Sequence, residues 1–393
     1  MRCGLSWIFL AEGEEAFSKK NPQLLSEMVR KIKGPDLSVA FYYDPLVHTD
    51  PDFFDVFDAA FPLIDPDLQL PLKTLILKEK PPARFPQPSP DPVETDSSSV
   101  AVIVRMRNAG KILPQTLKAL RSQTVKNIEI YAVDSGSQDD SVAIARRYGA
   151  MVETIAADSY FPGKVLNDAV KAVKTDLIVF LNSDSVLLTP ESLKNLLEAF
   201  QDPATTAAFG RQLPRPDAET WVKRDYAASF PSTSPPSWMH LSLCFAAMRR
   251  SVWEKFPFYI DAWGSEDTQW GYLAKKRGEK VSYVPNALLM HSHNYTLKQL
   301  YGRRFIEGEA DAFIFQKTCS IGSFAKDFIK GVVREFLLYF KKREWSSLKM
   351  IIPRRFVYSW AYYKGHRLGV RRRIEKDLDG SQGQKEVLKR YDD

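Results

Sequence analysis

Polar side chains that could bind a nucleotide diphosphate follow three short apolar runs of the sequence. Arginine guanidinium groups pair readily with phosphate oxygens, and a carboxylate such as Asp134 can accept hydrogen bonds from a base or ribose. Asp184 is suited to coordinate a hard divalent cation. Either aspartate alone could instead cap a turn or a helix, so the hypothesis depends on their joint placement. The candidate donor-binding residues of these segments are Arg105, Arg107, Asn108, Asp134, Ser135 and Asn182.

Two adjacent carboxylates and a histidine farther along the chain could take part in catalysis. Glu266 and Asp267 precede an expected helix, where acidic residues can also be simple caps favoured by the helix dipole. His291 follows the apolar run at residues 284–290. Such a histidine alone is also explained as a hydrogen-bonded core residue, and His293 is interpreted as closer to that structural role.

The elements that must position these residues form a regular alternation from residue 100 onward. Apolar runs at residues 100–104, 128–133, 151–155 and 177–181 predict short strands, and amphipathic segments between them predict helices. This alternation is typical of an α/β fold with a mainly parallel sheet and helices on both faces. Ligands of such sheets bind at the carboxyl ends of the strands, where the three polar segments lie.

Five motifs of the chain resemble glycosyltransferase family 2, whose members have the Rossmann-like GT-A fold. The motifs occupy residues 102–108, 133–137, 181–184, 263–267 and 290–295, and they occur in the family order. The turn at residues 134–137 and the segment at residues 291–296 most resemble the branch that contains bacterial rhamnosyltransferases. The resemblance implies transfer of a sugar from a nucleotide diphosphate donor.

The resemblance also implies a role for each motif. Asp184 and His291 would bind a divalent metal, Mn²⁺ or Mg²⁺, and an imidazole ligand favours Mn²⁺. Asp267 would be the general base on the acceptor hydroxyl, and Glu266 would orient or bind the acceptor. A base opposite the leaving group gives inversion at the anomeric carbon. The expected reaction is an inverting hexosyl or deoxyhexosyl transfer to a glycan or lipid-linked glycan, in cell-surface polysaccharide synthesis.

Four other positions are weaker candidates. Lys164 and Asn167 lie where the family contacts the donor, but an ordinary helix start explains them equally well. Trp263 and Trp270 flank the carboxylates and could stack on acceptor sugars, although tryptophans more often pack in a core. Residues 211–238 are rich in proline and serine, which predicts an acceptor loop or an irregular excursion.

Two departures from the family pattern leave the donor open. The family often has Asp-x-Asp where this chain has Asn182-x-Asp184, so the metal would depend on Asp184. Ser135 replaces an aspartate that many members use to hold uracil. Deoxythymidine and guanosine donors are therefore as admissible as uridine donors.

Composition divides the chain into four regions. Residues 1–80 contain strand-like runs at 37–43 and 72–77 and an expected helix at 23–32, and their role is unassigned. The proline- and serine-rich residues 81–99 predict a linker. Residues 100–315 would form the GT-A domain. Residues 316–393 combine aromatic and apolar residues at helical spacing with many cations. This pattern is typical of helices on an anionic membrane surface, or of helices packed on the core with a basic solvated face.

The whole-chain composition favours a cytoplasmic protein, peripheral on the inner membrane if it binds lipid. The chain has three widely spaced cysteines, too few for a disulfide framework, and no apolar run of bilayer length. The net charge of +7 suggests an anionic partner, but the cations gather near the C-terminus, so nucleic acid is not expected. Two alternatives stay open: a polyprenyl-phosphate sugar transferase, and an inactive scaffold that binds nucleotide sugars.

Overall fold

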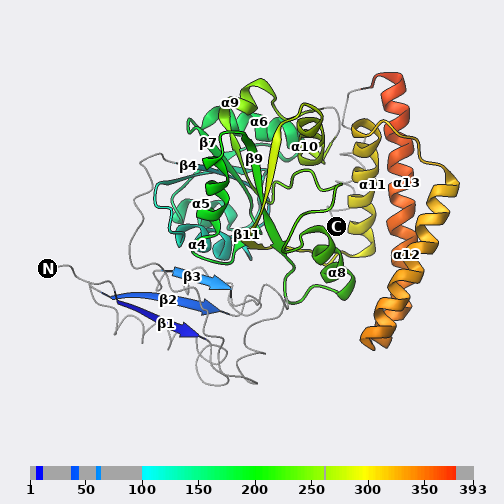
Figure 1. Cartoon of the computed structure of the whole chain (residues 1–393), viewed down its shortest axis with the longest axis horizontal. Coiled ribbons are helices and arrows are strands. Elements are labelled where there is room, and N and C mark those ends of the chain that lie inside the picture. The colour runs from blue at the N-terminus through cyan, green and yellow to red at the C-terminus, as the bar shows by residue number, and fades with distance from the viewer. Residues whose placement is uncertain (1–5, 12–36, 44–58, 63–99, 261–262, 378–393) are drawn as a thin grey trace.

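An eight-stranded mixed sheet forms the centre of the molecule (Figure 1). The computed structural model describes residues 6–11, 37–43, 59–62, 100–260 and 263–377. The strand order of the sheet is β6-β5-β4-β7-β10-β9-β11-β8. The strands are β4 (Val100–Met106), β5 (Ile128–Asp134), β6 (Ala150–Thr154), β7 (Leu177–Asn182), β8 (Val186–Leu187), β9 (Thr205–Leu213), β10 (Phe245–Arg249) and β11 (Lys280–Met290).

The four strands predicted from the apolar runs make up the parallel half of this sheet. β4 pairs in parallel with β5 and β7, and β5 pairs in parallel with β6. In the other half, β10 runs antiparallel to β7 and β9, whereas β11 is parallel to β9. The prediction of a mainly parallel sheet is therefore confirmed. The carboxyl ends of β4, β5 and β7 lie together, so the three polar segments share one edge.

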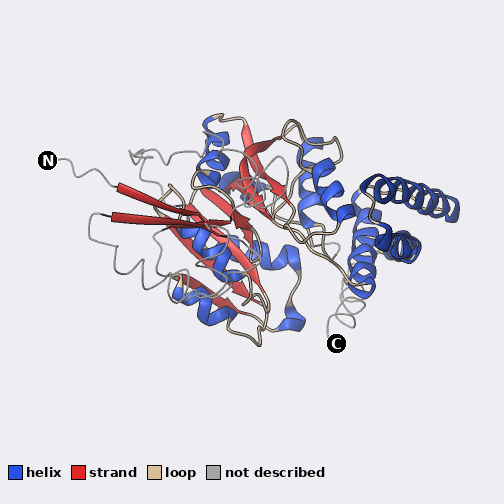
Figure 2. Cartoon of the chain, turned by 90° about the horizontal axis from the view of Figure 1, so that it is seen from below, coloured by secondary structure: helices blue, strands red, loops and turns tan. Residues whose placement is uncertain are grey.

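Helices cover both faces of the sheet, as the sequence predicts (Figure 2). Side chains alternate along β4, so that Val102 and Ile103 enter different cores. The Val102 core includes buried residues of α4 (Leu113–Arg121), α5 (Ser141–Arg147) and α7 (Ser192–Glu198). The Ile103 core includes residues of α6 (Pro162–Ala172), α9 (Arg250–Lys255) and α10 (Glu266–Lys276). This double burial explains why the strands read as continuous apolar runs.

Three long helices stand beside the sheet: α11 (Leu297–Ile314), α12 (Ile321–Lys342) and α13 (Ile351–Glu375) (Figure 1). The backbones of α11 and α13 approach closely, because the glycines Gly308 and Gly365 have no side chains and lie against the backbones of Tyr362 and Phe305. Arg372 of α13 forms a fully buried ion pair with Glu309 of α11. None of the described helices is both long enough and apolar enough to cross a bilayer.

A smaller parallel sheet precedes the linker region. Its strands are β1 (Ser6–Ala11), β2 (Leu37–Tyr43) and β3 (Ala59–Pro62), and β2 confirms the strand expected at residues 37–43. The helix expected at 23–32, the strand expected at 72–77 and the linker at 81–99 lie outside the described residues. The proposed division into four regions stays a prediction.

Candidate active site

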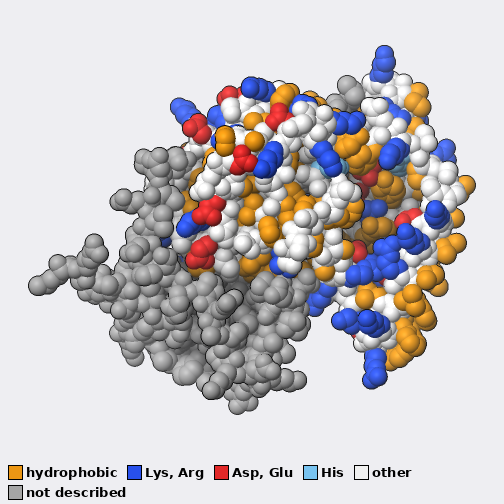
Figure 3. Space-filling model, in the orientation of Figure 1, with side chains coloured by type: hydrophobic (Ala, Val, Ile, Leu, Met, Phe, Trp, Pro, Cys, Tyr) orange, Lys and Arg blue, Asp and Glu red, His pale blue; other side chains and the backbone are white. Residues whose placement is uncertain are grey.

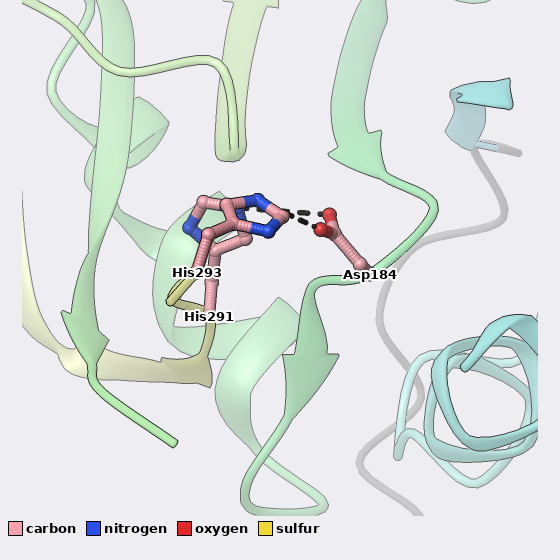
Figure 4. A group of neighbouring side chains, drawn as sticks. All are labelled: Asp184, His291 and His293. Carbon is pink, nitrogen blue, oxygen red and sulfur yellow. Dashed lines mark ion pairs between the residues drawn. The ribbon is translucent and has the colours of Figure 1, made fainter. Parts of the chain in front are cut away.

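Asp184, His291 and His293 form a compact cluster of possible metal ligands (Figure 4). The Nε2 atom of His293 lies 3.1 Å from Oδ2 of Asp184. The Nε2 atom of His291 lies 3.6 Å from Oδ1 of the same carboxylate. Each of the three residues offers one ligand atom, and these atoms all lie within 4.8 Å of one another.

Strand pairing brings these residues together across more than a hundred positions of sequence. Asp184 lies in the turn between β7 and β8, and His291 directly follows β11. β8 pairs antiparallel with β11, with Val186 opposite Met290. Asp184 and His291 lie within two residues of this pair. The strand pairing therefore places the carboxylate and the imidazole opposite each other at the edge of the sheet.

Hydrogen bonds behind His291 fix which nitrogen faces Asp184. The Nδ1 atom of His291 lies 3.1 Å from the amide oxygen of Gln212 and 3.2 Å from the Tyr226 hydroxyl. The amide nitrogen of Gln212 donates to the Ser242 hydroxyl at 2.8 Å, which orients the amide oxygen towards His291. An amide oxygen only accepts, so Nδ1 carries the proton and Nε2 presents its lone pair to Asp184.

The electrostatics of the cluster suit a divalent cation. Burial lowers the pKa of His291, although Asp184 opposes this shift, so the imidazole is neutral near pH 7. Burial of Asp184 would raise its pKa, but His291 and His293 outweigh it and hold the pKa well below the usual range. The carboxylate is therefore ionised. One carboxylate and two imidazole rings fit Mn²⁺ better than Mg²⁺, which prefers oxygen ligands.

Glu266 and Asp267 are the first two residues of α10, and the turn that precedes the helix sets the position of their side chains. Gly264 and Ser265 both have positive φ, at 91° and 57°. The carboxylate of Glu266 lies 2.6 Å from the Arg105 guanidinium at the end of β4. Asp267 accepts hydrogen bonds from the backbone N–H of Thr268 at 2.7 Å and of Leu243 at 3.3 Å. Burial, reinforced by the charge of Glu266, raises the pKa of Asp267 to about 6.

The carboxylate pair and the histidines line one large cavity between the sheet and the C-terminal helices. Its wall includes Glu266, Asp267, His291 and His293. Asn182 and Trp263 line the same cavity, and the Trp263 indole N–H donates to the carbonyl oxygen of Tyr160 at 3.3 Å. The structure thus brings together the predicted base, the predicted metal ligands and one predicted acceptor residue.

The predicted donor loops are bound to each other. Asp134 is buried and accepts hydrogen bonds from the backbone N–H groups of Gly136 and Ser137. Asn108 has a positive φ of 48°, and its side-chain oxygen accepts from the N–H of Gln138 at 2.8 Å. The hydroxyl of buried Ser135 donates to the Met106 carbonyl at 3.3 Å. These bonds make Asp134 an organiser of its own turn, and they fix the loops at the sheet edge.

Three cations and one asparagine that are predicted to bind the donor lie in different environments. Arg105 is mostly buried, and its guanidinium forms an ion pair with the carboxylate of Glu266. Arg107 and Lys164 are exposed at the surface. Asn182 donates from its amide to the Cys244 sulfur at 3.3 Å. Of these four residues, Arg107 and Lys164 keep their charges open to a phosphate.

Two predicted site residues instead support the core. Trp270 is completely buried, and its indole N–H donates to the Phe256 carbonyl at 2.7 Å, so it has no face for an acceptor sugar. The side-chain oxygen of Asn167 accepts from the Trp253 indole and the Phe258 N–H, and its amide donates to the Phe258 carbonyl. Since all its polar atoms are engaged, Asn167 holds α6 in place.

Three residues of the cluster escaped prediction. The sequence favours a structural role for His293, but its imidazole lies closer to Asp184 than that of His291 does. Gln212 and Tyr226 lie in residues 211–238, which looked irregular but contain the end of β9 and the helix α8 (Thr220–Ser229). The repeat of histidine at positions 291 and 293 was the available signal for His293. No local pattern indicated Gln212.

Comparison with known proteins gives the family of the chain. Residues 101–256 match the family described as glycosyl transferase family 2. The O-antigen chain rhamnosyltransferase RfbN of Salmonella typhimurium (strain LT2) is 30% identical over 69% of this chain and 89% of its own length. The chain belongs to glycosyltransferase family 2. Its mixed sheet with helices on both faces is the GT-A fold that the motifs predicted for this family.

Other similar proteins include a second enzyme of the same kind. The O-antigen chain rhamnosyltransferase WbaN of Salmonella anatum is 29% identical over 69% of this chain and 89% of its own length. The resemblance of this family 2 glycosyltransferase to bacterial rhamnosyltransferases is therefore confirmed. Among solved structures, the mannosyltransferase PcManGT from Pyrobaculum calidifontis, in complex with GDP-Man and Mn²⁺, has a TM-score of 0.49 and 14% identity, covering 71% of this chain and 88% of that chain.

Proposed function

We propose that this family 2 glycosyltransferase transfers a sugar from a nucleotide diphosphate to a glycan hydroxyl, with inversion and with a divalent metal. The observation that carries the proposal is the joint placement of two groups in one cavity. A carboxyl with a pKa near neutrality, Asp267, lines the same cavity as the histidines of the Asp184 cluster. A protein that only bound nucleotide sugars would have no use for such a base.

Asp267 is suited to accept the proton of the acceptor hydroxyl. Its raised pKa of about 6 keeps it mostly ionised at pH 7 while making it more basic than an ordinary aspartate. Two backbone N–H groups hold its carboxylate in place. The neighbouring Glu266 is neutralised by Arg105, so the pair presents one free carboxylate to the acceptor. Attack by the deprotonated oxygen opposite the leaving group inverts the anomeric centre.

Asp184, His291 and His293 would hold the metal ion. When bound, a divalent ion neutralises the charge that develops on the leaving diphosphate. Gln212 fixes the tautomer of His291, so that its Nε2 lone pair is available without rearrangement. Arg107, exposed just after β4, and Lys164, exposed in the first turn of α6, would add positive charge at the phosphates.

We further propose that the transferred sugar is rhamnosyl and that the acceptor belongs to a cell-surface polysaccharide, free or lipid-linked. Two relatives that match most of their length to this chain are named as O-antigen chain rhamnosyltransferases. Trp263, in the wall of the cavity beside Asp267, would contact the acceptor sugar.

The reaction can be tested by incubating the protein with nucleotide-diphosphate rhamnose donors, Mn²⁺ and oligosaccharide acceptors. The product is analysed by NMR for its anomeric configuration. The expected result is a glycoside of configuration opposite to that of the donor, formed by wild type and not by Asp267→Asn. A product that keeps the donor configuration would contradict the single-displacement mechanism. Nucleotide-sugar binding without any transfer would favour a scaffold.

A further inference from the structure

The outer side of α12 carries an apolar stripe that no other part of the described structure covers. Ile329, Val333, Phe336 and Phe340 are spaced by four, three and four residues and therefore share one face of the helix. Each is about half exposed or more, from 48% at Phe336 to 60% at Ile329. Trp345, just beyond the helix, is 56% exposed and packs edge-on against Phe340 at 5.2 Å.

This concentration is peculiar to the C-terminal helices. Among the described residues, all strongly exposed large hydrophobic side chains except Met151, Trp238 and Ile260 lie between Ile321 and Ile374. Figure 3 shows hydrophobic side chains along the edge of the molecule formed by α12. Soluble domains rarely leave a contiguous apolar surface of this kind without a partner.

The charges of α12 indicate what that partner is. Lys326, Lys330, Arg334 and Lys341 are exposed and form a second stripe beside the apolar one. The two acidic residues of the helix both have partners on α13. Exposed Asp327 accepts a hydrogen bond from the Ser359 hydroxyl at 2.6 Å, and fully buried Glu335 pairs with Arg354 at 2.7 Å. The exposed surface of α12 is therefore mainly cationic and apolar.

We propose that this α12 face, made of the apolar stripe and the adjacent cationic stripe, docks the protein on an anionic lipid surface. The apolar side chains enter the boundary between headgroups and acyl chains, and the cations pair with lipid phosphates. A second copy of the chain is a poorer partner, because pairing two such faces would bring their cationic stripes together.

Docking through this face also fits the position of the candidate active site. The cavity that contains Asp267 extends to α12, where Phe324 and Asp327 line it. A docked α12 keeps one wall of that cavity at the lipid surface, where a lipid-linked glycan is held. This last step rests on the proposed function, whereas the docking itself does not.

The proposal is tested by co-sedimentation with vesicles of phosphatidylcholine alone or mixed with phosphatidylglycerol. Wild type is expected to bind the mixed vesicles, to bind phosphatidylcholine far more weakly, and to be released as salt is raised. Lys330→Glu combined with Arg334→Glu should weaken binding by at least about tenfold. Phe336→Ser combined with Phe340→Ser should weaken it by at least about tenfold as well.

The matched control is Met151→Ser, which removes a side chain that is 69% exposed on β6 and should leave vesicle binding unchanged. Nucleotide-sugar binding by each variant separates a loss of docking from a loss of folding or of transfer chemistry. Equal binding to both vesicle types, or unchanged binding by the Phe336/Phe340 variant, would overturn the proposal. So would a dimer in solution that this variant converts to a monomer.

Discussion

The guanidinium of Arg105 lies 2.6 Å from the carboxylate of Glu266, although the two residues are 161 positions apart in sequence. Arg105 is the last residue but one of β4, and Glu266 begins α10. The ion pair therefore joins the donor edge of the sheet to the helix that carries the predicted base. It also engages one of two adjacent carboxylates in an ion pair, and the other, Asp267, is the proposed base.

Substitution of Arg105 and substitution of Glu266 should shift the pH dependence of transfer in opposite directions. Glu266 raises the pKa of Asp267 and Arg105 lowers it. Arg105→Met should therefore shift the acid limb of kcat/KM to higher pH, and Glu266→Gln should shift it to lower pH. Arg105→Met should also destabilise the fold by roughly 3–5 kcal/mol, because it leaves a buried charge unpaired. Identical pH profiles in the two folded variants would show that the pair does not tune the base.

Asp267→Asn should reduce kcat by about 10²- to 10⁴-fold while donor binding stays unchanged. In wild type, a base is active only when deprotonated, so kcat/KM should rise with pH and level off above about 6, the pKa of Asp267. Steady-state rates between pH 4.5 and 8, together with donor titrations, measure both effects. An Asn variant with wild-type activity would remove Asp267 from the mechanism.

Gln212 should control metal affinity without touching the metal. Gln212→Leu removes the amide acceptor for the Nδ1 proton of His291 and leaves only the Tyr226 hydroxyl near this atom, so the imidazole can turn or change tautomer, and Mn²⁺ affinity should fall about 10- to 100-fold. Gln212→Glu keeps an acceptor at that place and should retain most of the affinity. Titration of Mn²⁺ by calorimetry compares the two variants. Equal losses in both would indicate a packing role for Gln212.

Two glycine-to-alanine changes in the C-terminal helices should have opposite effects on stability. A Cβ at position 365 would collide with the Phe305 backbone, so Gly365→Ala should destabilise the protein by roughly 1–3 kcal/mol. At position 322, in the first turn of α12, the nearest atom to an added Cβ is 3.6 Å away. Gly322→Ala should therefore be neutral or stabilising by up to about 1 kcal/mol. Thermal unfolding of the two variants provides the comparison.

The parallel half of the sheet and its edge could be predicted from sequence because they depend on local patterns. Continuous apolar runs marked β4, β5 and β7, and polar residues at their ends marked the site. The long-range pairings were not visible. From the sequence, Arg105 is a candidate phosphate ligand, but in the structure it pairs with Glu266. Likewise, Trp270 is a candidate for stacking on a sugar, but in the structure it is completely buried.

The C-terminal helices show the same limit. The sequence combined apolar and cationic residues and left membrane docking and core packing as equal alternatives. The structure shows core packing for α13 and leaves an exposed apolar and cationic face on α12. Arg354 and Arg372 of α13 are buried in ion pairs, whereas Lys330 and Arg334 of α12 point outward. Burial of an arginine depends on a partner from another helix, such as Glu335 or Glu309, and no local pattern encodes that contact.

The central claim is that Asp184 and its two histidines bind the donor through a metal. The most direct measurement is calorimetry of UDP-, GDP- and dTDP-sugar binding with Mn²⁺ present and absent, in wild type and Asp184→Ala. We predict that one donor binds wild type only with metal, that Asp184→Ala abolishes this binding, and that His293→Ala weakens it. Donor binding that is independent of Mn²⁺, or is unchanged in a folded Asp184→Ala variant, would contradict the claim.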